Sequence, residues 1–249
     1  MRVFYGLDNL PQFSNAVATM GSFDGVHGGH RVLLERVKAR ARSMGGESVV
    51  LTFNPHPRYV LGTAEGMQLL STLDEKILLL ERMGIDNLVV IPFTVEFSRT
   101  SPEEFIKRTI ASIGVRWLIV GYNHRFGYRK QGDYKFLEEC GEGLNIEMVE
   151  QQQIAQSKVS STVIRRCVEQ GDMAEAAQLL SHPYIVLCSA LGNGCFKPVD
   201  CNKLLPPAGE YKANIAGRVV SLVVKADGEL QIDGCELENI SDKIVVEIG

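Results

Sequence analysis

The sequence predicts an α/β fold in which a doubly wound parallel sheet is followed by a small antiparallel β domain. In the first 180 or so residues, strand-like segments alternate with helix-like ones, and single helices between strands favour right-handed crossovers and parallel pairing. After Pro183 the pattern changes to short strand-like segments divided by Gly, Pro, Asn and Asp. We therefore expect a first domain over residues 1–185 and a second over 186–249.

The composition is that of an ordinary globular protein, with 249 residues, 45% apolar and 22% charged. A formal charge of −4 argues against a protein that coats nucleic acid or an anionic membrane. No apolar run approaches the roughly 18 residues of a membrane span, and Asp8, Asn9 and Pro11 interrupt any signal-peptide core. The six cysteines form no C-x-x-C pair, which is typical of reduced thiols. The sequence thus predicts a soluble, cytoplasmic protein and leaves its oligomeric state open.

Apolar segments and helix caps give the order of elements in the first domain. An apolar stripe predicts a helix over His30–Met44. Thr72 with Glu75, and Ser101 with Glu104, form capping boxes that predict two further helix starts. The predicted strands are Ala16–Met20, Ser48–Phe53, Asn87–Phe93, Trp117–Val120 and, more weakly, Ile146–Val149.

In the second domain the strand-like segments are shorter and lie close together. Asp227-Gly228 is typical of a hairpin turn. The predicted strands are Tyr184–Leu191, Tyr211–Ile215, Val219–Lys225, Leu230–Asp233 and Lys243–Ile248. This pattern predicts a small antiparallel sheet or barrel.

Unusual residues gather in the loops where a parallel sheet binds ligands, beyond the carboxyl ends of its strands. These loops are Gly21–His30, Asn54–Arg58, Gly121–Asp133 and the segment before Ser160. Gly21–His30 joins a strand to an amphipathic helix, and its glycines allow close backbone approach to a phosphate at the helix N-terminus. His27 and His30 could both donate to phosphate oxygens, although a glycine-rich turn with incidental histidines is the alternative. A zinc site would need a third ligand, which no nearby Cys or His motif supplies.

Two other segments also have simple structural interpretations. The hydroxyls of Ser160–Thr162 are suited to capping a helix that runs to about Glu169, which would leave Arg165 as a surface cation. Pro55-His56-Pro57 fixes an extended loop, because each proline locks its own φ and restricts the residue before it.

Taken together, these motifs resemble a known family. His27-Gly28-Gly29-His30 looks like the H-x-G-H signature of the nucleotidyltransferase superfamily, and Gly21–His30 resembles more narrowly the prokaryotic bifunctional riboflavin kinase/FAD synthetase family. Phe53–Pro57, Val120–Gly127 and Ser160–Arg165 agree with that family in the same order. The resemblance spans residues 15 to about 185 and implies a Rossmann-like nucleotidyltransferase domain.

The resemblance also implies a role for individual residues. His27, His30 and Arg165 would be catalytic. ATP would be held by Gly21, Phe23, Asp24, Gly25, His27, His30, Ser161, Thr162 and Arg165. The flavin would be bound by Asn54, Pro55, His56, Pro57, Asn123, Arg125 and Phe126. Asn123 stands where the family often has Asp, and its uncharged amide binds magnesium less well.

The implied reaction is FMN adenylyltransfer, ATP + FMN → FAD + pyrophosphate, with Mg²⁺ carried by the phosphates and no metal ligand assigned in the protein. Two alternatives stay open. One is a non-catalytic flavin or adenine-nucleotide sensor, which Asn123 and the divergent tail favour, and the other is a nucleotidyltransferase that acts on another phosphorylated substrate. The presence of His27, His30 and Arg165 speaks against the sensor.

We expect no riboflavin kinase activity. The family's kinase domain carries a G-R-x-x-G-[FY]-P-T-A-N segment whose Thr and Asn meet magnesium and ATP phosphates. The equivalent stretch here, Gly192–Asn202, keeps Pro198 and Asn202 but has no Thr after that proline, and the chain ends at Gly249, where the family would still need a closing helix. Asp200 or Asn202 could still hold a metal.

Overall fold

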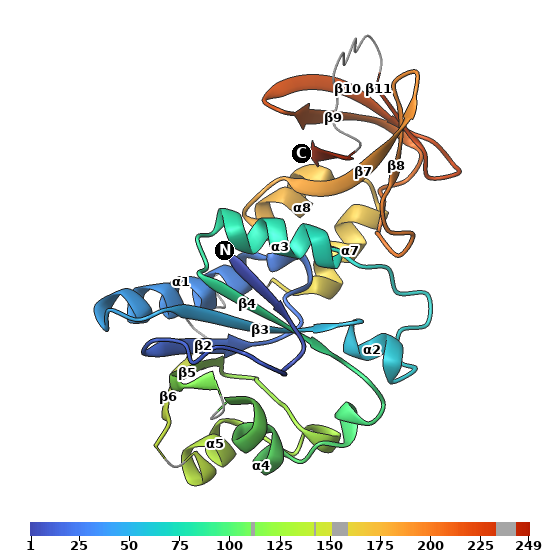
Figure 1. Cartoon of the computed structure of the whole chain (residues 1–249). Coiled ribbons are helices and arrows are strands. Elements are labelled where there is room, and N and C mark those ends of the chain that lie inside the picture. The colour runs from blue at the N-terminus through green and yellow to red at the C-terminus, as the bar shows by residue number, and fades with distance from the viewer. Residues whose placement is uncertain (111–112, 142, 151–158, 233–242) are drawn as a thin grey trace. The chain divides into compact units, whose positions relative to one another are not determined.

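The computed structural model describes residues 1–110, 113–141, 143–150, 159–232 and 243–249 (Figure 1). The chain forms two compact units, each assembled from separate stretches of sequence. Unit 1 comprises Met1–Phe23, Gly29–Met67 and Leu79–Gln156, and unit 2 comprises Asp24–Gly28, Gln68–Leu78 and Ser157–Gly249.

Unit 1 contains a parallel six-stranded sheet in the order β1-β4-β3-β2-β5-β6. Its strands are β1 (Arg2–Tyr5), β2 (Ala16–Met20), β3 (Ser48–Asn54), β4 (Asn87–Pro92), β5 (Val115–Gly121) and β6 (Asn145–Val149). Every residue of β2 is buried, as expected for a parallel sheet covered on both faces. The predicted doubly wound parallel sheet is confirmed. The edge strand β1 was not predicted, because its four residues are only partly buried and carry no clear apolar pattern.

The described helices of the first 150 residues are α1 (Gly28–Ser43), α2 (Pro57–Val60), α3 (Leu73–Arg82), α4 (Pro102–Phe105) and α5 (Tyr134–Cys140), with a π-helical turn η3 at Ile106–Ile110 and 3-10 turns η1 (Asp24–Val26), η2 (Phe97–Arg99) and η5 (Tyr128–Lys130). Helices α1, α3 and α4 begin close to the predicted starts. Helices α2 and α5 were not predicted, and Pro57, which was expected to lie in an extended loop, is the first residue of α2. The Thr72–Glu75 capping box forms, because the Thr72 N–H donates to Glu75 Oε2 at 2.9 Å and the Glu75 N–H to Thr72 Oγ1 at 3.4 Å. Ser101 caps α4 by accepting from the Glu104 N–H at 3.2 Å. Helix α1 begins two residues before the predicted His30, since Gly28 and Gly29 already take part in its first turn.

Unit 2 contains a closed antiparallel barrel with strand order β10-β11-β8-β7-β12-β9. Its strands are β7 (Tyr184–Gly192), β8 (Cys195–Pro198), β9 (Gly209–Ile215), β10 (Arg218–Val224), β11 (Leu230–Ile232) and β12 (Lys243–Ile248). The small antiparallel β domain is therefore confirmed, and Asp227-Gly228 forms the predicted turn between β10 and β11, with the Gly228 N–H donating to Lys225 O at 3.0 Å. The short strand β8 was not predicted, and Asp233 lies outside the described residues.

Two helices, α7 (Ser161–Glu169) and α8 (Met173–Leu180), belong to unit 2 and share its core. Ile164 and Leu180 are buried in the same cluster as Val186 and Leu222 of the barrel. The compact units thus divide the chain differently from a single boundary at residue 185, which assigns α7 and α8 to the first domain.

Two of the sequence-based expectations concern membranes and thiols. No helix within the described ranges is long and apolar enough to cross a membrane. The described cysteines, Cys140, Cys167, Cys188, Cys195 and Cys201, are free thiols. Cys235 lies outside the described residues.

Candidate functional site

The glycine-rich turn after β2 is held in an unusual backbone conformation. Phe23, Gly25 and Val26 all have positive φ, at 47°, 78° and 42°. A Cβ at Gly25 would lie 3.1 Å from Leu70 Cβ, so this position requires glycine for its conformation and for space. A β-branched residue in the left-handed region costs on the order of 1–3 kcal/mol, and such strain is concentrated at functional sites. The turn is therefore a candidate site on backbone geometry alone.

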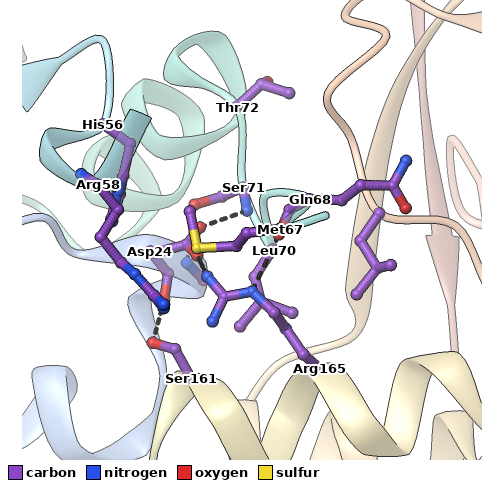
Figure 2. Close-up of polar contacts among 12 residues, drawn as sticks. Asp24, His56, Arg58, Met67, Gln68, Leu70, Ser71, Thr72, Ser161 and Arg165 are labelled. Atoms are coloured by element: carbon purple, nitrogen blue, oxygen red, sulfur yellow. Dashed lines mark hydrogen bonds and ion pairs between the residues drawn. The ribbon is translucent and has the colours of Figure 1, made fainter. Parts of the chain in front are cut away.

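Asp24 is the centre of the polar contacts in this turn, and it is only 3% exposed. Its Oδ1 accepts from the Ser71 N–H at 2.9 Å, and its Oδ2 forms an ion pair with Arg165 Nη2 (Figure 2). Next to it, the Gly25 N–H donates to Ser71 Oγ at 2.8 Å. A carboxylate buried to this degree needs such partners, because a buried charge without hydrogen bonds or a counter-charge is costly. Asp24 thus joins the turn to two distant segments of unit 2.

Helix α7 brings two of the predicted ATP-binding residues to Asp24. Ser160 is its N-cap and accepts from the Val163 N–H at 3.3 Å, while the Ser161 hydroxyl donates to Asp24 O at 3.3 Å (Figure 2). Arg165 lies one turn further along α7, and its Nε donates to Gln68 O at 2.9 Å. Ser160 therefore caps α7, as the simple structural interpretation expected, whereas Ser161 and Arg165 contact Asp24 of the glycine-rich turn. Thr162 is exposed in the first turn of α7.

Arg165 has donors beyond those that hold the turn. A guanidinium carries five N–H groups, and the contacts to Asp24 and Gln68 use two of them. It is not the surface cation of the simple structural interpretation, because its side chain is 11% exposed. Its remaining donors are suited to a phosphate, for which the planar guanidinium has matching geometry.

His27 is the buried histidine of the turn. Burial lowers its pKa from the usual 6.5 to about 4, and the carboxylate of Asp24 opposes only part of that shift. At neutral pH His27 is therefore an uncharged imidazole, which can donate one hydrogen bond. His30, in the first turn of α1, packs its ring edge-on against Phe23 with centroids 5.1 Å apart.

His182, which the sequence analysis did not single out, also fixes the turn. Its Nε2 lies 2.9 Å from Gly25 O and its Nδ1 lies 2.7 Å from Pro183 O. Both acceptors are carbonyl oxygens, so both hydrogen bonds form together only when both ring nitrogens carry protons. Because His182 is 157 residues from Gly25 in the sequence, no local pattern signals this contact.

A second buried ion pair in unit 2 was also missed. Lys203 Nζ lies 2.9 Å from Glu75 Oε2, and both side chains are 1% exposed. Glu75 was predicted only as part of a capping box, whereas its Oε1 also accepts from the Leu187 N–H at 2.8 Å. Lys203 lies in the connection between β8 and β9, where a single lysine carries no sequence signal for burial.

The predicted flavin-binding residues lie in unit 1, on loops that leave the carboxyl ends of neighbouring strands. Asn54 ends β3 and is exposed, and His56 caps α2 by accepting from the Arg58 N–H at 3.2 Å. Pro55 and Pro57 flank that histidine, and Pro57 is the first residue of α2. Strands β3, β2 and β5 are adjacent in the sheet, so their following loops share one edge.

The loop after β5 has a buried end and an exposed one. Asn123 is exposed, and Arg125 forms an ion pair with Asp133, the N-cap of α5. Phe126 is only 8% exposed and packs against Phe105 in the core of unit 1, with centroids 5.7 Å apart. Its contacts are those of a core side chain that anchors the loop.

Within the described part of the chain, no group of three or more His, Cys, Asp or Glu residues could hold a metal ion. The zinc interpretation of His27 and His30 gains no third ligand among these residues.

Comparison with known proteins identifies the class to which this fold and these motifs belong. A family model described as FAD synthetase matches residues 10–163, and the chain belongs to this family. The resemblance drawn from the four sequence motifs is thereby confirmed. More narrowly, the relatives are named bifunctional riboflavin kinase/FMN adenylyltransferase.

Three of these relatives show the extent of the similarity. The Listeria monocytogenes protein is 34% identical over 172 residues, which cover 68% of this chain and 55% of the relative. The Bacillus subtilis protein is 33% identical over 83% of this chain and 70% of the relative. The Escherichia coli K12 protein is 30% identical over 75% of this chain and 61% of the relative. The matches thus span less than two thirds of the Listeria and Escherichia proteins.

A solved structure supports the fold alone. A crystal structure named for a macrolide-efflux protein from Streptococcus pneumoniae matches with a TM-score of 0.83 at 22% identity, covering 100% of this chain and 90% of that chain.

Proposed function

We propose that this protein is an FMN adenylyltransferase, which converts ATP and FMN into FAD and pyrophosphate. In this reaction an FMN phosphate oxygen attacks the α-phosphorus of ATP, the new O–P bond forms, and the bond to the β-phosphate oxygen breaks. The observation that best supports the proposal is the meeting of two family motifs at Asp24, since Ser161 and Arg165 reach the glycine-rich turn across about 140 residues of sequence. Membership of the FAD synthetase family supports it independently.

Catalysis would rest on alignment and on stabilising negative charge, because FMN already carries the attacking oxygen. Fixed donors aimed at phosphate oxygens stabilise the charge that develops in the transition state. We assign this role to His27 and His30 on the triphosphate. Ser161, Thr162 and Arg165 of α7 would bind the leaving pyrophosphate.

The neutral state of His27 fits a donor role. An imidazole whose pKa is lowered to about 4 by burial keeps one N–H at physiological pH. Transfer of that proton is not required, since the attacking FMN phosphate is already ionised. His27 would then act as a fixed dipole rather than as a general acid.

The FMN subsite is proposed at the loops of unit 1. Asn54, Pro55, His56 and Pro57 would line it on one loop. Asn123 and Arg125 would line it on another, with Phe126 anchoring that loop in the core. Magnesium would enter as the complex with ATP and neutralise phosphate charge, a role for which Mg²⁺ needs few protein ligands.

The test is to incubate purified protein with ATP, Mg²⁺ and FMN and to measure FAD by chromatography and pyrophosphate by a coupled assay. Equal formation of FAD and pyrophosphate is expected. Tight binding of ATP or FMN without product would overturn the enzyme assignment in favour of a sensor. Product formed only with a different phosphate ester would overturn the choice of FMN.

We also propose that the barrel has no riboflavin kinase activity. In the stretch Gly192–Asn202 the Asp200 carboxylate accepts from the Asn202 N–H at 2.8 Å and from its Nδ2 at 3.0 Å. Both hydrogen bonds end on Asp200 Oδ1 and hold the two residues in a turn, and the stretch lacks the Thr that follows the proline in the family's motif. Positioning of the γ-phosphate is most of the catalysis in phosphoryl transfer. Formation of FMN from riboflavin, ATP and Mg²⁺ above a no-enzyme control would contradict this.

A further inference from the structure

The segment Gln68–Thr72, which we call the bridging segment, has polar contacts in two directions within unit 2. Its Gln68 carbonyl accepts from Arg165 Nε, and its Ser71 N–H donates to Asp24 Oδ1 (Figure 2). The Ser71 hydroxyl accepts from the Gly25 N–H. These contacts hold the groups to which we assign ATP binding. The bridging segment is therefore the backbone frame behind Asp24 and Arg165.

The middle of the bridging segment is held from the other direction by the connection between β8 and β9 of the barrel. The Leu69 N–H donates to Asn202 O at 2.8 Å, and the Leu204 N–H donates to Leu69 O at 2.9 Å. Between them, Lys203 Nζ donates to Leu70 O at 2.6 Å. Three consecutive barrel residues thus fix two consecutive residues of the bridging segment.

The Lys203 ammonium is buried, so its position is closely determined. It lies 2.9 Å from Glu75 Oε2 and 4.0 Å from the centre of the Tyr184 ring. Burial lowers the pKa of Lys203, while the Glu75 carboxylate favours the charged form. Glu75 in turn accepts from the backbone N–H of Thr72, the last residue of the bridging segment. Lys203 therefore binds the segment at Leu70 O, and Glu75 binds it at the Thr72 N–H, so the two contacts lie on either side of Ser71.

We propose that Lys203, through its pair with Glu75, is a positioning residue for ATP binding. It acts through the bridging segment, which sets the Gln68 carbonyl against Arg165 and the Ser71 N–H against Asp24. The connection between β8 and β9 of the barrel then supports the proposed ATP-binding residues of unit 2. The inference rests on the proposed function for its ligand.

The test compares Lys203→Met with the charge-neutral double variant E75Q/K203M. The single variant leaves Glu75 buried without its cation and is expected to melt at a lower temperature. The double variant removes both charges and keeps an amide oxygen at residue 75 that can accept from backbone N–H groups. Its melting temperature is therefore expected to return most of the way to that of wild type. Lys225→Met is the matched control, because it breaks the Lys225–Glu229 pair of the barrel without touching the bridging segment.

The readouts are the Kd of MgATP by calorimetry, the separate KM values for ATP and FMN, and amide exchange of the bridging segment, all on folded protein. In the double variant we expect a weaker MgATP Kd by roughly 3- to 30-fold, the range of typical positioning effects. We also expect a similar rise in the KM for ATP, faster exchange at Ser71 and an unchanged KM for FMN. Lys225→Met should match wild type in all four.

A folded double variant with the MgATP Kd and amide exchange of wild type would overturn the inference. A stability loss alone, with unchanged Kd, would also overturn it, since a merely structural pair does not alter affinity per folded molecule. If wild type binds MgATP and the Kd shifts as expected but no FAD forms, the proposed function fails while the positioning role stands.

Discussion

Replacement of Arg165 by Met separates the stabilising role of its ion pair from its role toward phosphate. The side chains of Arg165 and Asp24 are 11% and 4% exposed, so the variant leaves a buried carboxylate without its cation. Breaking a buried pair in this way costs about 3–5 kcal/mol. For a chain of this size each kcal/mol shifts Tm by about 2–4 °C. We therefore expect Tm to fall by roughly 6–20 °C, the product of those two ranges.

Adding Asp24→Asn to this variant removes the unpaired charge. The Asn oxygen can still accept from the Ser71 N–H, which now donates to Asp24 Oδ1 at 2.9 Å. The double variant should regain most of the lost Tm, because neutral replacement of a buried pair is often tolerated. Its turnover should stay low by roughly 10²–10³, since a donor to the developing phosphate charge is still missing.

Thermal melting and steady-state FAD formation, measured on the same preparations, check both expectations. A double variant that recovers Tm and also turns over within about threefold of wild type would refute the reasoning, because mutational losses of a transition-state contact are far larger. Arg165 would then serve only to compensate Asp24.

Three further predictions concern the glycine-rich turn. His30→Ala should lower turnover by about 10²–10³, while loss of its contact with Phe23 should cost only about 0.5–1.5 kcal/mol of stability; near-normal turnover in folded protein would exclude the catalytic role. Burial lowers the pKa of His27 to about 4 from 6.5, so the unfolded chain binds more protons between these values and stability falls as pH drops from 6.5 to 4. In His27→Gln the difference in the free energy of unfolding between pH 7 and pH 4, measured by denaturant titration, should be smaller than in wild type by roughly 2–3 kcal/mol. The same pH dependence in the variant and in wild type would contradict this prediction. Gly25→Ala should destabilise more than Gly217→Ala in chemical denaturation, because both have positive φ but only Gly25 would meet a neighbour, Leu70 Cβ at 3.1 Å; equal losses would argue against the close contact.

Much of the fold could be read from local patterns in the sequence. A continuous apolar run such as Ala16–Met20 predicts a strand of a parallel sheet, because both faces of such a sheet are covered, and this strand is fully buried. The Thr72–Glu75 capping box could also be predicted, because it depends on two residues only three positions apart. Elements with weak local signals were missed. The edge strand β1 is only partly buried, and β8 has four residues, so each depends on its neighbours for its structure.

Part of the candidate site could also be predicted from local patterns in the sequence. Glycines, histidines and prolines at strand ends mark loops that bind ligands, and this located His27, His30 and Ser161. Phe126 shows the limit of motif reasoning, since its place in the core follows from packing against Phe105 rather than from its neighbours in the sequence. His182 was not found, because a histidine before a proline has no pattern that reveals a distant carbonyl partner.

The sequence by itself determined the parallel sheet, the antiparallel tail and the family, because periodicity, caps and ordered motifs are properties of neighbouring residues. Only the tertiary structure decided which charges meet. Asp24 pairs with Arg165 from 141 residues away, and Lys203 reaches Leu70 O from 133 residues away. Such pairs arise when folding removes water from groups brought together by packing, and the energy of a buried charge depends on that enclosure rather than on the residues beside it in the chain.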